Sequence, residues 1–247
     1  GMKYLKESAD KGCVDAMMYY GSYLYRGTYI PADIDESMVY FKKAADLGEV
    51  TPMVNYAFYM LNNESIPNHF EISAKYYKMA ADRGDKRAML RYGELVDKGN
   101  GVPMNKAEAL KYFKMAGENG ETTGYNNYAY ILYHGEGVPV DSEEGVKYFK
   151  IAADLGDIDA IVNYVDILLA DKNYENVELA FKYCTEGVKQ GDPRALFKMG
   201  QFFLEGKGVE EDKIKALQFF KMASDKGHGQ AMSYYGLMLY KGIGVPQ

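Results

Sequence analysis

The stretch YFKIAADLG, residues 148–156, decides the fold, because versions of it recur along the whole chain. AADLG also ends at Gly48, and the variants AADRG and ASDKG end at Gly84 and Gly227. The glycines that close such a step, which we call anchor glycines, are Gly12, Gly48, Gly84, Gly120, Gly156, Gly191 and Gly227. Successive anchors are 36 residues apart, except for one interval of 35. A fixed period of this length predicts a repeat protein.

The residues that follow each anchor predict a first helix, which we call helix A. Small or apolar residues recur 4, 5, 8, 9 and 12 positions after the anchor, and the eighth position is a tyrosine in all repeats but one. This spacing places them on one side of an amphipathic helix. The ninth position is mostly glycine or alanine, as at Gly93 and Ala129, which lets helix A approach a neighbouring helix closely.

The residues that precede each anchor predict a second helix, which we call helix B. An aromatic pair such as Tyr112-Phe113 stands near its middle, two small residues follow, and the anchor glycine ends it. DSEE at 141–144 has the acidic residues of a helix N-terminus, and Asp192-Pro193 and Thr51-Pro52 are typical of an N-cap followed by the first helical residue. A recurring lysine with an acid four residues later, as in Lys42 and Asp46, predicts a solvated row of ion pairs.

One helical hairpin cannot bury its apolar faces alone, but stacked hairpins can, so the sequence predicts an all-α solenoid. The combined pattern resembles the Sel-1-like repeats, a subclass of tetratricopeptide-like α/α solenoids. The copy that carries the resemblance best runs from GYNNYAYILYHGEGVPVD (124–141) to EEGVKYFKIAADLG (143–156). The resemblance covers 1–247 as one domain of about six repeats of 36 residues with a half-repeat at each end, and it implies a right-handed superhelix. Ordinary tetratricopeptide repeats have a shorter period and a tryptophan column, whereas this chain has no tryptophan.

Two repeats depart from the pattern, and so do the ends. Repeat 2 has NNESIPNH (62–69) in place of the glycine loop; repeat 5 has DKNYE (171–175) there and Thr185-Glu186-Gly187-Val188 in its second helix. Whether these departures build a site is left open. The chain starts inside a helix B and stops after a helix A, so we expect a segment of a longer protein, with Gly1 a cloning remnant.

Composition excludes several classes of function. The net charge of −6 argues against nonspecific nucleic-acid binding, which needs clustered Lys and Arg. No apolar run reaches the roughly 18 residues of a membrane span. The two cysteines, Cys13 and Cys184, are too far apart in sequence for a zinc motif. We expect no metal, no cofactor and no membrane insertion; a cytoplasmic location is favoured, and the oligomeric state is left open.

The glycine loop GEGVPVD (135–141) raises the question of a phosphate-binding loop. Such a loop follows a strand and appears once, whereas this GxG recurs in four repeats and no strand is predicted. The recurrence indicates a turn between helix A and helix B, with glycines supplying positive φ. No histidine or cysteine falls in a nucleophile or metal-ligand pattern, so no catalytic residues are predicted.

The resemblance implies that helix A lines the concave side of the solenoid, where a partner would bind. Seven positions after each anchor the side chains are mostly amides and cations, which suit the backbone and carboxylates of an extended peptide. Aromatic neighbours supply the ring types that dominate binding hot spots. The candidate partner-binding residues are Asn55, Phe58, Arg91, Asn127, Tyr130, Asn163, Asp166, Phe197 and Lys198. The alternative is that they are hydrated surface residues or hydrogen-bond one repeat to the next.

We therefore predict a non-enzymatic protein–protein interaction scaffold, an adaptor that binds a protein or peptide. A first alternative is a regulatory segment that packs on another domain of its own chain. A second is a hydrolase of β-lactam or cell-wall material, as the resemblance suggests for some proteins of this kind, but no residue here maps to that mechanism.

Overall fold

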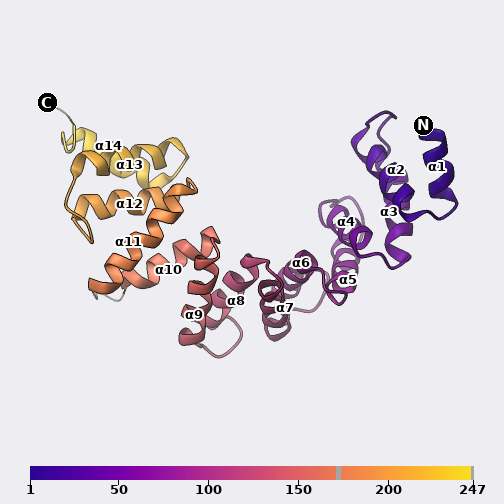
Figure 1. Cartoon of the computed structure of the whole chain (residues 1–247), viewed down its shortest axis with the longest axis horizontal. Helices are drawn as coiled ribbons and strands as arrows, with labels where there is room; N and C mark the ends of the chain where they lie inside the picture. Colours follow the sequence, from indigo (N-terminus) through magenta and orange to yellow (C-terminus); the bar gives the residue numbers. More distant parts are fainter. Residues whose placement is uncertain (171–173, 246–247) are drawn as a thin grey trace. The chain divides into compact units, whose positions relative to one another are not determined.

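A computed structural model of the chain describes residues 1–170 and 174–245 (Figure 1). Within these residues the chain forms fourteen α-helices and no strand. The helices are α1 (Met2–Asp10), α2 (Val14–Arg26), α3 (Ile34–Asp46), α4 (Val50–Leu61), α5 (His69–Ala81), α6 (Lys86–Lys98), α7 (Lys106–Glu118), α8 (Thr122–His134), α9 (Ser142–Asp154), α10 (Ile158–Ala170), α11 (Tyr174–Lys189), α12 (Pro193–Glu205), α13 (Lys213–Asp225) and α14 (Gly229–Tyr240). The predicted all-α repeat architecture is confirmed, with even-numbered helices as helix A and odd-numbered helices as helix B.

The chain divides into two compact units. Unit 1 comprises Gly1–Gly124 and unit 2 comprises Tyr125–Gln247, so the boundary falls within α8. The expectation that 1–247 is a single domain stays a prediction.

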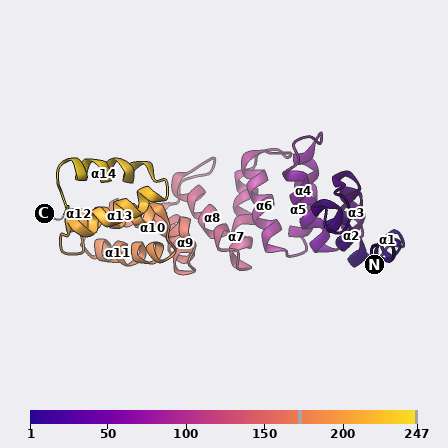
Figure 2. The ribbon, with the colours of Figure 1, turned by 90° about the horizontal axis from the view of Figure 1, so that it is seen from above.

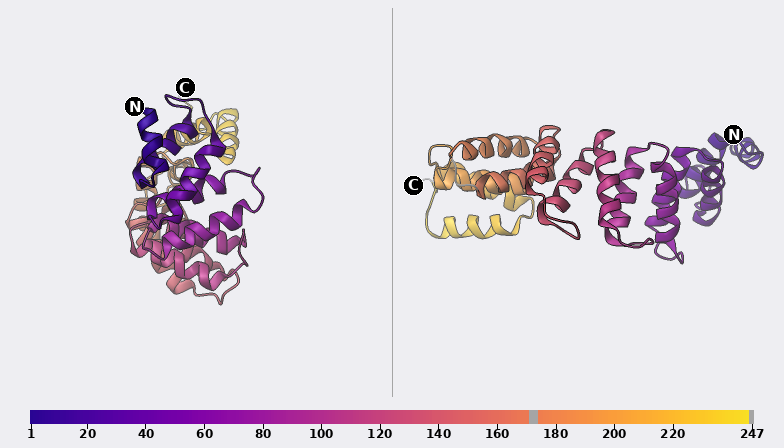
Figure 3. Two further views of the ribbon diagram at one scale, coloured as in Figure 1. Left: turned by 90° about the vertical axis from the view of Figure 1, so that its right-hand side faces the viewer. Right: turned by 90° about the horizontal axis from the view of Figure 1, so that it is seen from below.

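In unit 1, each helix packs on its neighbours in sequence, and α4 to α7 stand side by side (Figure 3). The buried residues of α2 are Ala16, Met17, Tyr20, Gly21 and Leu24. These are the positions 4, 5, 8, 9 and 12 after Gly12, so the predicted stripe of helix A is confirmed. Burial of this stripe against α1 and α3 stabilises the hairpins, because an isolated helix of this length is only marginally stable in water.

In unit 2, α12, α13 and α14 lie side by side at the C-terminal end (Figure 2). One hydrophobic cluster extends from Ala129 on α8 to Met238 on α14. Its largest fully buried side chains include Phe149, Ile161, Leu196 and Phe220. The core of unit 2 is therefore continuous from hairpin to hairpin, as expected for stacked repeats.

The tyrosine columns of the two helices meet inside the hairpins of repeats 1 to 5. The helix-A tyrosine contacts the first aromatic residue of helix B edge to face, for example Tyr92 with Tyr112 at 4.7 Å between ring centroids. The same geometry recurs for Tyr20–Tyr40, Tyr56–Tyr76, Tyr128–Tyr148 and Tyr164–Tyr183. Edge-to-face packing is the arrangement that aromatic quadrupoles favour, so these tyrosines hold the hairpins together.

The small residue beside each tyrosine makes room for the second aromatic ring of helix B. A Cβ atom added at Gly93 would lie 2.7 Å from the Phe113 ring, and one at Gly200 would lie 2.6 Å from the Phe220 ring. Both contacts are too short for real atoms, so a larger residue would push the two helices apart. The packing role predicted for this column is confirmed.

The GxG loops are turns, as predicted. Gly135 and Gly137 have φ of 67° and 74°, a left-handed conformation that glycine adopts without strain. Gly101, in the loop between α6 and α7, has a further role. A Cβ added there would lie 2.3 Å from the backbone of Phe70 at the start of α5. The loop therefore lies directly on the preceding helix B and sets the spacing between hairpins.

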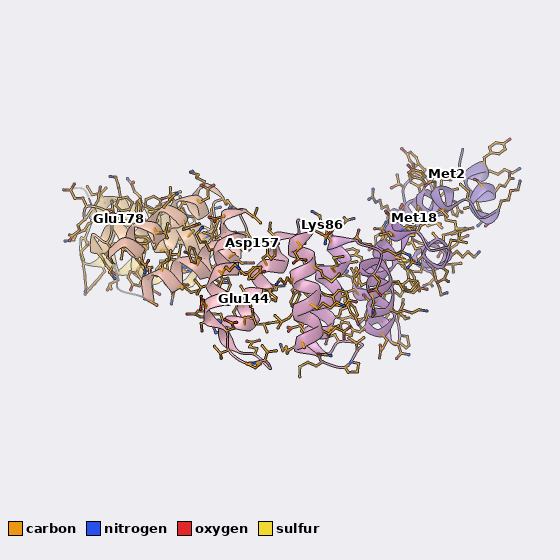
Figure 4. All side chains as sticks on the ribbon, turned by 60° about the horizontal axis from the view of Figure 1, so that its bottom comes forward. Met2, Met18, Lys86, Glu144, Asp157 and Glu178 are labelled. Carbon is orange, nitrogen blue, oxygen red and sulfur yellow. The ribbon has the colours of Figure 1, made fainter. Side chains whose placement is uncertain are left out.

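Two of the three helix starts that the sequence predicted are confirmed. Asp141 caps α9 by accepting a hydrogen bond from the backbone N–H of Glu144, and Asp157 caps α10 in the same way from Ala160 (Figure 4 labels Glu144 and Asp157). Asp192 caps α12, with Pro193 in its first turn. The prediction for Thr51-Pro52 is wrong by two residues: α4 begins at Val50, and Pro52 falls at its third position, where a missing N–H still costs nothing.

The lysines of helix B form the predicted i,i+4 ion pairs with acids of the same helix. A tyrosine of the following helix B joins these pairs, a contact that the sequence did not predict. Lys78 Nζ lies 2.9 Å from Asp82, and the Tyr112 hydroxyl of the following helix B donates to the same carboxylate at 2.8 Å. Burial alone would raise the pKa of Asp82, but these two hydrogen bonds hold it below its ordinary value. The carboxylate pairs Asp10–Tyr40, Asp46–Tyr76 and Asp154–Tyr183 repeat the contact 29 or 30 residues apart. This ladder ties α1 to α3, α3 to α5 and α5 to α7 in unit 1, and α9 to α11 in unit 2.

Candidate functional site

The candidate surface is the exposed side of the helix-A layer, which we call the helix-A face: the positions 7, 10 and 14 residues after each anchor glycine, whose side chains are exposed or half-buried. Phe197, at position 6, is the one predicted binding residue outside this set. Unit 1 carries three of the predicted binding residues, Asn55, Phe58 and Arg91. Unit 2 carries the other six: Asn127, Tyr130, Asn163, Asp166, Phe197 and Lys198.

In unit 1 the three residues differ in how far they are available to a partner. Phe58 is 50% exposed and packs edge to face on Tyr59. Asn55 is half-buried, whereas Arg91 is exposed and bonded to Glu94 of its own helix at 2.8 Å. Of these three residues, Phe58 therefore presents a ring at the surface.

In unit 2 the asparagines form a chain of hydrogen bonds between repeats. Asn163 Nδ2 on α10 donates to Asn126 Oδ1 on α8 at 3.1 Å, and Asn126 Nδ2 donates to Asn127 Oδ1 at 3.4 Å. Asn126 is buried, and no sequence pattern distinguished it from its half-buried neighbour Asn127. The alternative that these residues hydrogen-bond one repeat to the next is therefore correct in part for Asn163 and Asn127. Each amide still has further donor or acceptor capacity.

A cation and an acid also join neighbouring repeats. Lys198 on α12 forms an ion pair with Asp166 on α10. The lysine side chain is only 16% exposed, whereas the Asp166 side chain is 57% exposed. The pair therefore presents its carboxylate, more than its ammonium group, to solvent.

The two remaining aromatic candidates in unit 2 behave differently. Tyr130 is 42% exposed and lies against the ring of His134, so it presents a ring at the surface. Phe197 is 7% exposed and packs on His228 at 4.8 Å and on Tyr234 at 5.4 Å. We correct the expectation for Phe197: its ring is covered by the following repeat and supports the face from within.

Two clefts lie on the helix-A face of unit 2, between successive A helices. The first, of about 250 Å³, separates α8 from α10. Its lining combines Tyr133, His134, Asn163, Asp166, Ile167 and Ala170 with the buried ring of Phe149. A polar wall thus faces an apolar floor, as in sites that fix an orientation with a few polar groups.

The second cleft repeats the arrangement one hairpin further on. It measures about 110 Å³ and is lined by Leu169, Lys198, Gln201, Phe202, Glu205 and Lys207. Asp166 lines the first cleft and its partner Lys198 lines the second, so their ion pair stands between the two. The predicted residues Asn163, Asp166 and Lys198 are therefore brought together at one place.

The irregular repeat 5 has a cleft of its own on the opposite, helix-B side. About 540 Å³ lies between α9 and α11, lined in part by Phe181, Thr185, Glu186 and Lys189, where the regular repeats have other side chains. Of the irregular loop DKNYE (171–175), residues 171–173 lie outside the described residues. In repeat 2, the irregular loop is held locally by Asn62 Nδ2, which donates to the carbonyl of Phe58 at 2.7 Å.

Two titratable side chains of unit 2, Cys184 and His228, have structural roles. Burial raises the pKa of the Cys184 thiol to about 12, and a thiolate is the reactive form of cysteine. Burial lowers the pKa of His228, whose Nδ1 accepts the backbone N–H of Ala231 as a helix cap. Across residues 1–170 and 174–245, no three His, Cys, Asp or Glu side chains gather to hold a metal ion.

Stacked helical hairpins with a repeating tyrosine core and glycine turns define a tetratricopeptide-like helical repeat protein. The family model for the Sel1 repeat matches residues 14–49, 53–85, 86–121, 123–157, 193–228 and 229–247. Together these segments cover well over half of the sequence, and the chain belongs to the Sel1 repeat family. The unmatched interval 158–192 contains repeat 5, which the sequence identified as irregular.

Solved structures show the same fold. A Sel1 repeat protein from Oxalobacter formigenes superposes with a TM-score of 0.84 at 23% identity, over 96% of this chain and 68% of that one. c5321, a protective antigen of uropathogenic Escherichia coli with an SLR fold, gives a TM-score of 0.60 at 20% identity, over 99% of this chain and 60% of that one. The pilF protein of Pseudomonas aeruginosa gives 0.61 at 16% identity, over 95% and 99%. No curated protein matches the sequence.

Sel1 repeat proteins are generally non-enzymatic scaffolds for protein interactions. No helix in the described part of the chain is long and apolar enough to cross a membrane.

Proposed function

We propose that this protein is a non-enzymatic adaptor that binds an extended peptide segment of a protein partner across the helix-A face of unit 2. The observation that carries the proposal is the pair of clefts between α8, α10 and α12, which repeat at the same positions of successive helices. An extended peptide is itself periodic, so it can place successive side chains into successive clefts.

The chemistry of the clefts suits such a segment. The amides of Asn127 and Asn163 retain capacity for peptide N–H and C=O groups, and the exposed carboxylate of Asp166 accepts from a donor. Tyr130 supplies an exposed ring beside the first cleft, and Ile167 contributes apolar lining. Polar groups therefore provide the register, and burial of apolar side chains provides the affinity.

Site-directed photo-cross-linking in an extract of the source cells tests the proposal. A photoreactive phenylalanine replaces Tyr130 on the helix-A face, and in a control protein it replaces Glu186 on the helix-B side. We expect a discrete cross-linked partner from position 130 and not from position 186. Adding Ala170→Arg and Gln201→Arg, which fill the clefts with bulk, should abolish that product.

The absence of a cross-linked partner from position 130 contradicts the proposal, and so do two further outcomes. One is equal cross-linking from both positions, which indicates nonspecific capture. The other is a product that survives the cleft-filling changes while thermal unfolding shows that the variants remain folded. The double variant Asn127→Ala/Asn163→Ala tests the contribution of the amides alone, without filling the clefts. Unchanged partner recovery would show that the asparagines are not part of the binding surface.

A further inference from the structure

Three positions in the first turns of two consecutive A helices form a small cluster, which we call the station. Its residues differ between the two units. The station consists of three positions: the third residue after one anchor glycine, and the first and third residues after the next. In repeats 5 and 6 of unit 2 these are Asp159, Asp192 and Arg194. In repeats 1 and 2 of unit 1 they are Asp15, Glu49 and Thr51.

In unit 2 the station holds a guanidinium group between two carboxylates. Arg194 Nη2 lies 2.7 Å from Asp159 Oδ1 and 2.8 Å from Asp192 Oδ2. Arg194 Nε adds a contact to Asp192 at 3.2 Å. The chain thus shows directly what this pair of acids binds: a planar cation that donates to both carboxylates at once.

In unit 1 both acids are present and the arginine is not. Asp15 is the second residue of α2 and Asp159 the second residue of α10, so the acids have the same register. Glu49 precedes α4 as its N-cap but makes no capping bond, whereas Asp192 caps α12 with its side chain. Thr51 stands where Arg194 stands, and it is too short to reach across.

Neither acid has another partner in the described part of the chain. No Lys or Arg nitrogen there lies within 4.0 Å of Asp15 or Glu49. Arg83 lies beside the neighbouring Gly48, where its Nη2 would be 3.9 Å from an added Cβ, but its Nη1 donates to the carbonyl of Met79 at 3.1 Å. The two carboxylates are left with unused acceptor capacity.

The station in unit 1 opens into a cleft with room for a long side chain. About 370 Å³ lies between α2 and α4, lined by Val14, Asp15, Met18, Tyr19, Ser22, Glu49, Thr51 and Pro52. Tyr19 is 61% exposed, and together with Met18 and Pro52 it offers an apolar wall. Arginine needs both features, because its methylene stem packs on apolar surface while its guanidinium group takes carboxylates and aromatic faces.

We propose that the cleft between α2 and α4 binds an arginine side chain of a protein or peptide partner. Asp15 and Glu49 hold the guanidinium group as Asp159 and Asp192 hold Arg194, and Tyr19 and Met18 cover the stem. This inference rests on the proposed function only in that the arginine belongs to a protein partner. Its site lies in unit 1, apart from the clefts of unit 2.

A titration of the ¹⁵N-labelled full chain with the peptide acetyl-Gly-Arg-Gly-amide tests the site. We expect chemical-shift changes at the backbone amides of 13–22 and 49–52, and none when citrulline, the neutral isostere, replaces arginine. The double variant Asp15→Asn/Glu49→Gln should weaken binding by at least about fivefold, because charge-assisted hydrogen bonds are lost. The matched control Glu143→Gln removes an exposed acid of unit 2 and should leave binding unchanged.

Thr51→Arg gives a second, independent measurement. It restores the arginine of the equivalent station, so it should abolish the response to the peptide. It should also raise the thermal midpoint, and adding Asp15→Asn should cancel that rise. The site is refuted if these amides do not respond to saturating arginine peptide, or if they respond equally to the citrulline peptide or in the Asp15→Asn/Glu49→Gln variant.

The two proposals fail separately. If the arginine peptide binds at Asp15 and Glu49 but position 130 yields no cross-linked partner, the adaptor function of unit 2 is contradicted and the arginine site stands. If position 130 yields a partner and the amides around Asp15 stay silent, only the arginine site is lost.

Discussion

The α6/α7 hairpin of unit 1 and the α10/α11 hairpin of unit 2 solve the same packing problem with opposite distributions of bulk. In the first, Gly93 on helix A faces the ring of Phe113 on helix B. In the second, the equivalent positions hold Val165 and Cys184, both 1% exposed within one core cluster. The volume moved from helix B to helix A while the interface stayed filled. In these two hairpins the combined volume of the two side chains is therefore similar, although each side chain differs.

The same two regions differ in the ladder of helix B. In unit 1, Asp82 on α5 accepts from Tyr112 on α7. In unit 2, α11 has Lys189 where the acid should stand, and α13 has Phe219 where the tyrosine should stand. The acid and the tyrosine are thus absent together. Without the carboxylate, a tyrosine hydroxyl at this position would have no acceptor for its hydrogen bond. The irregularity of repeat 5 is thus a coordinated change.

The largest effect should come from removing the ring on which the regular hairpin depends. Phe113→Ala should lower the free energy of unfolding by about 3–5 kcal/mol, because it leaves a cavity beside a glycine that cannot fill it. Cys184→Ala at the equivalent position should cost only about 1 kcal/mol, since little volume is lost. Urea denaturation followed by circular dichroism measures both. Equal losses would break the comparison.

The next effect tests whether the volumes are shared. Cys184→Phe should cost about 1–3 kcal/mol, because Val165 already occupies the space. Adding Val165→Ala recreates the Ala129 and Phe149 pair of repeat 4 and should recover most of the loss. A double-mutant cycle gives the coupling directly, and strictly additive losses would show that the two side chains do not compete.

An alkaline titration sharpens the comparison of the ladders. Burial, and then the hydrogen bond to Asp154, raise the pKa of Tyr183 to about 12. A group with a raised folded-state pKa contributes stability that is present below about pH 10, the ordinary value for tyrosine, and is lost as the pH rises through about 12. Tyr183→Phe should therefore reduce the fall in the urea midpoint between about pH 8 and pH 11. A fall as steep as in the unchanged protein would contradict the assignment.

The smallest effect is a repair of the interrupted ladder. Lys189→Asp together with Phe219→Tyr should raise the free energy of unfolding by about 0.5–1.5 kcal/mol, the usual net value of one hydrogen bond. Each single change should give no gain, because its partner is missing. A thermal unfolding series of the four proteins measures this, and a gain from either single change would point to a different cause.

The sequence predicted the parts of the fold that depend on periodicity. The stripe of α2, the glycine turns and the glycine-to-ring contacts all follow from columns that repeat every 36 residues. Contacts between columns were not predicted. Asp82 was already assigned to an ion pair within its own helix and Tyr112 to the core of its hairpin, so nothing in the sequence required the two residues to bind each other. The burial of Phe197 depends on His228 and Tyr234, which follow no repeat-wide rule.

The same limit applies to the candidate surface. The sequence placed Asn163, Asp166 and Lys198 on one face, but not the ion pair that stands between the two clefts. The sequence did not predict the arginine station, because the station needs three positions from two repeats, and a triad that occurs once forms no column. Arg194 bridges Asp159 and Asp192 only in the folded chain.

The loop glycine that lies on the preceding helix has a consequence for how the chain folds. Gly101 fits only against the start of α5, a helix made some 30 residues earlier, and the strong contacts of each unit likewise join consecutive helices. Low contact order favours fast folding, and domains form from the N-terminus as the chain is synthesised. Each new hairpin can therefore dock on the one that emerged before it, so that the ribosome delivers the repeats in the order in which they stack.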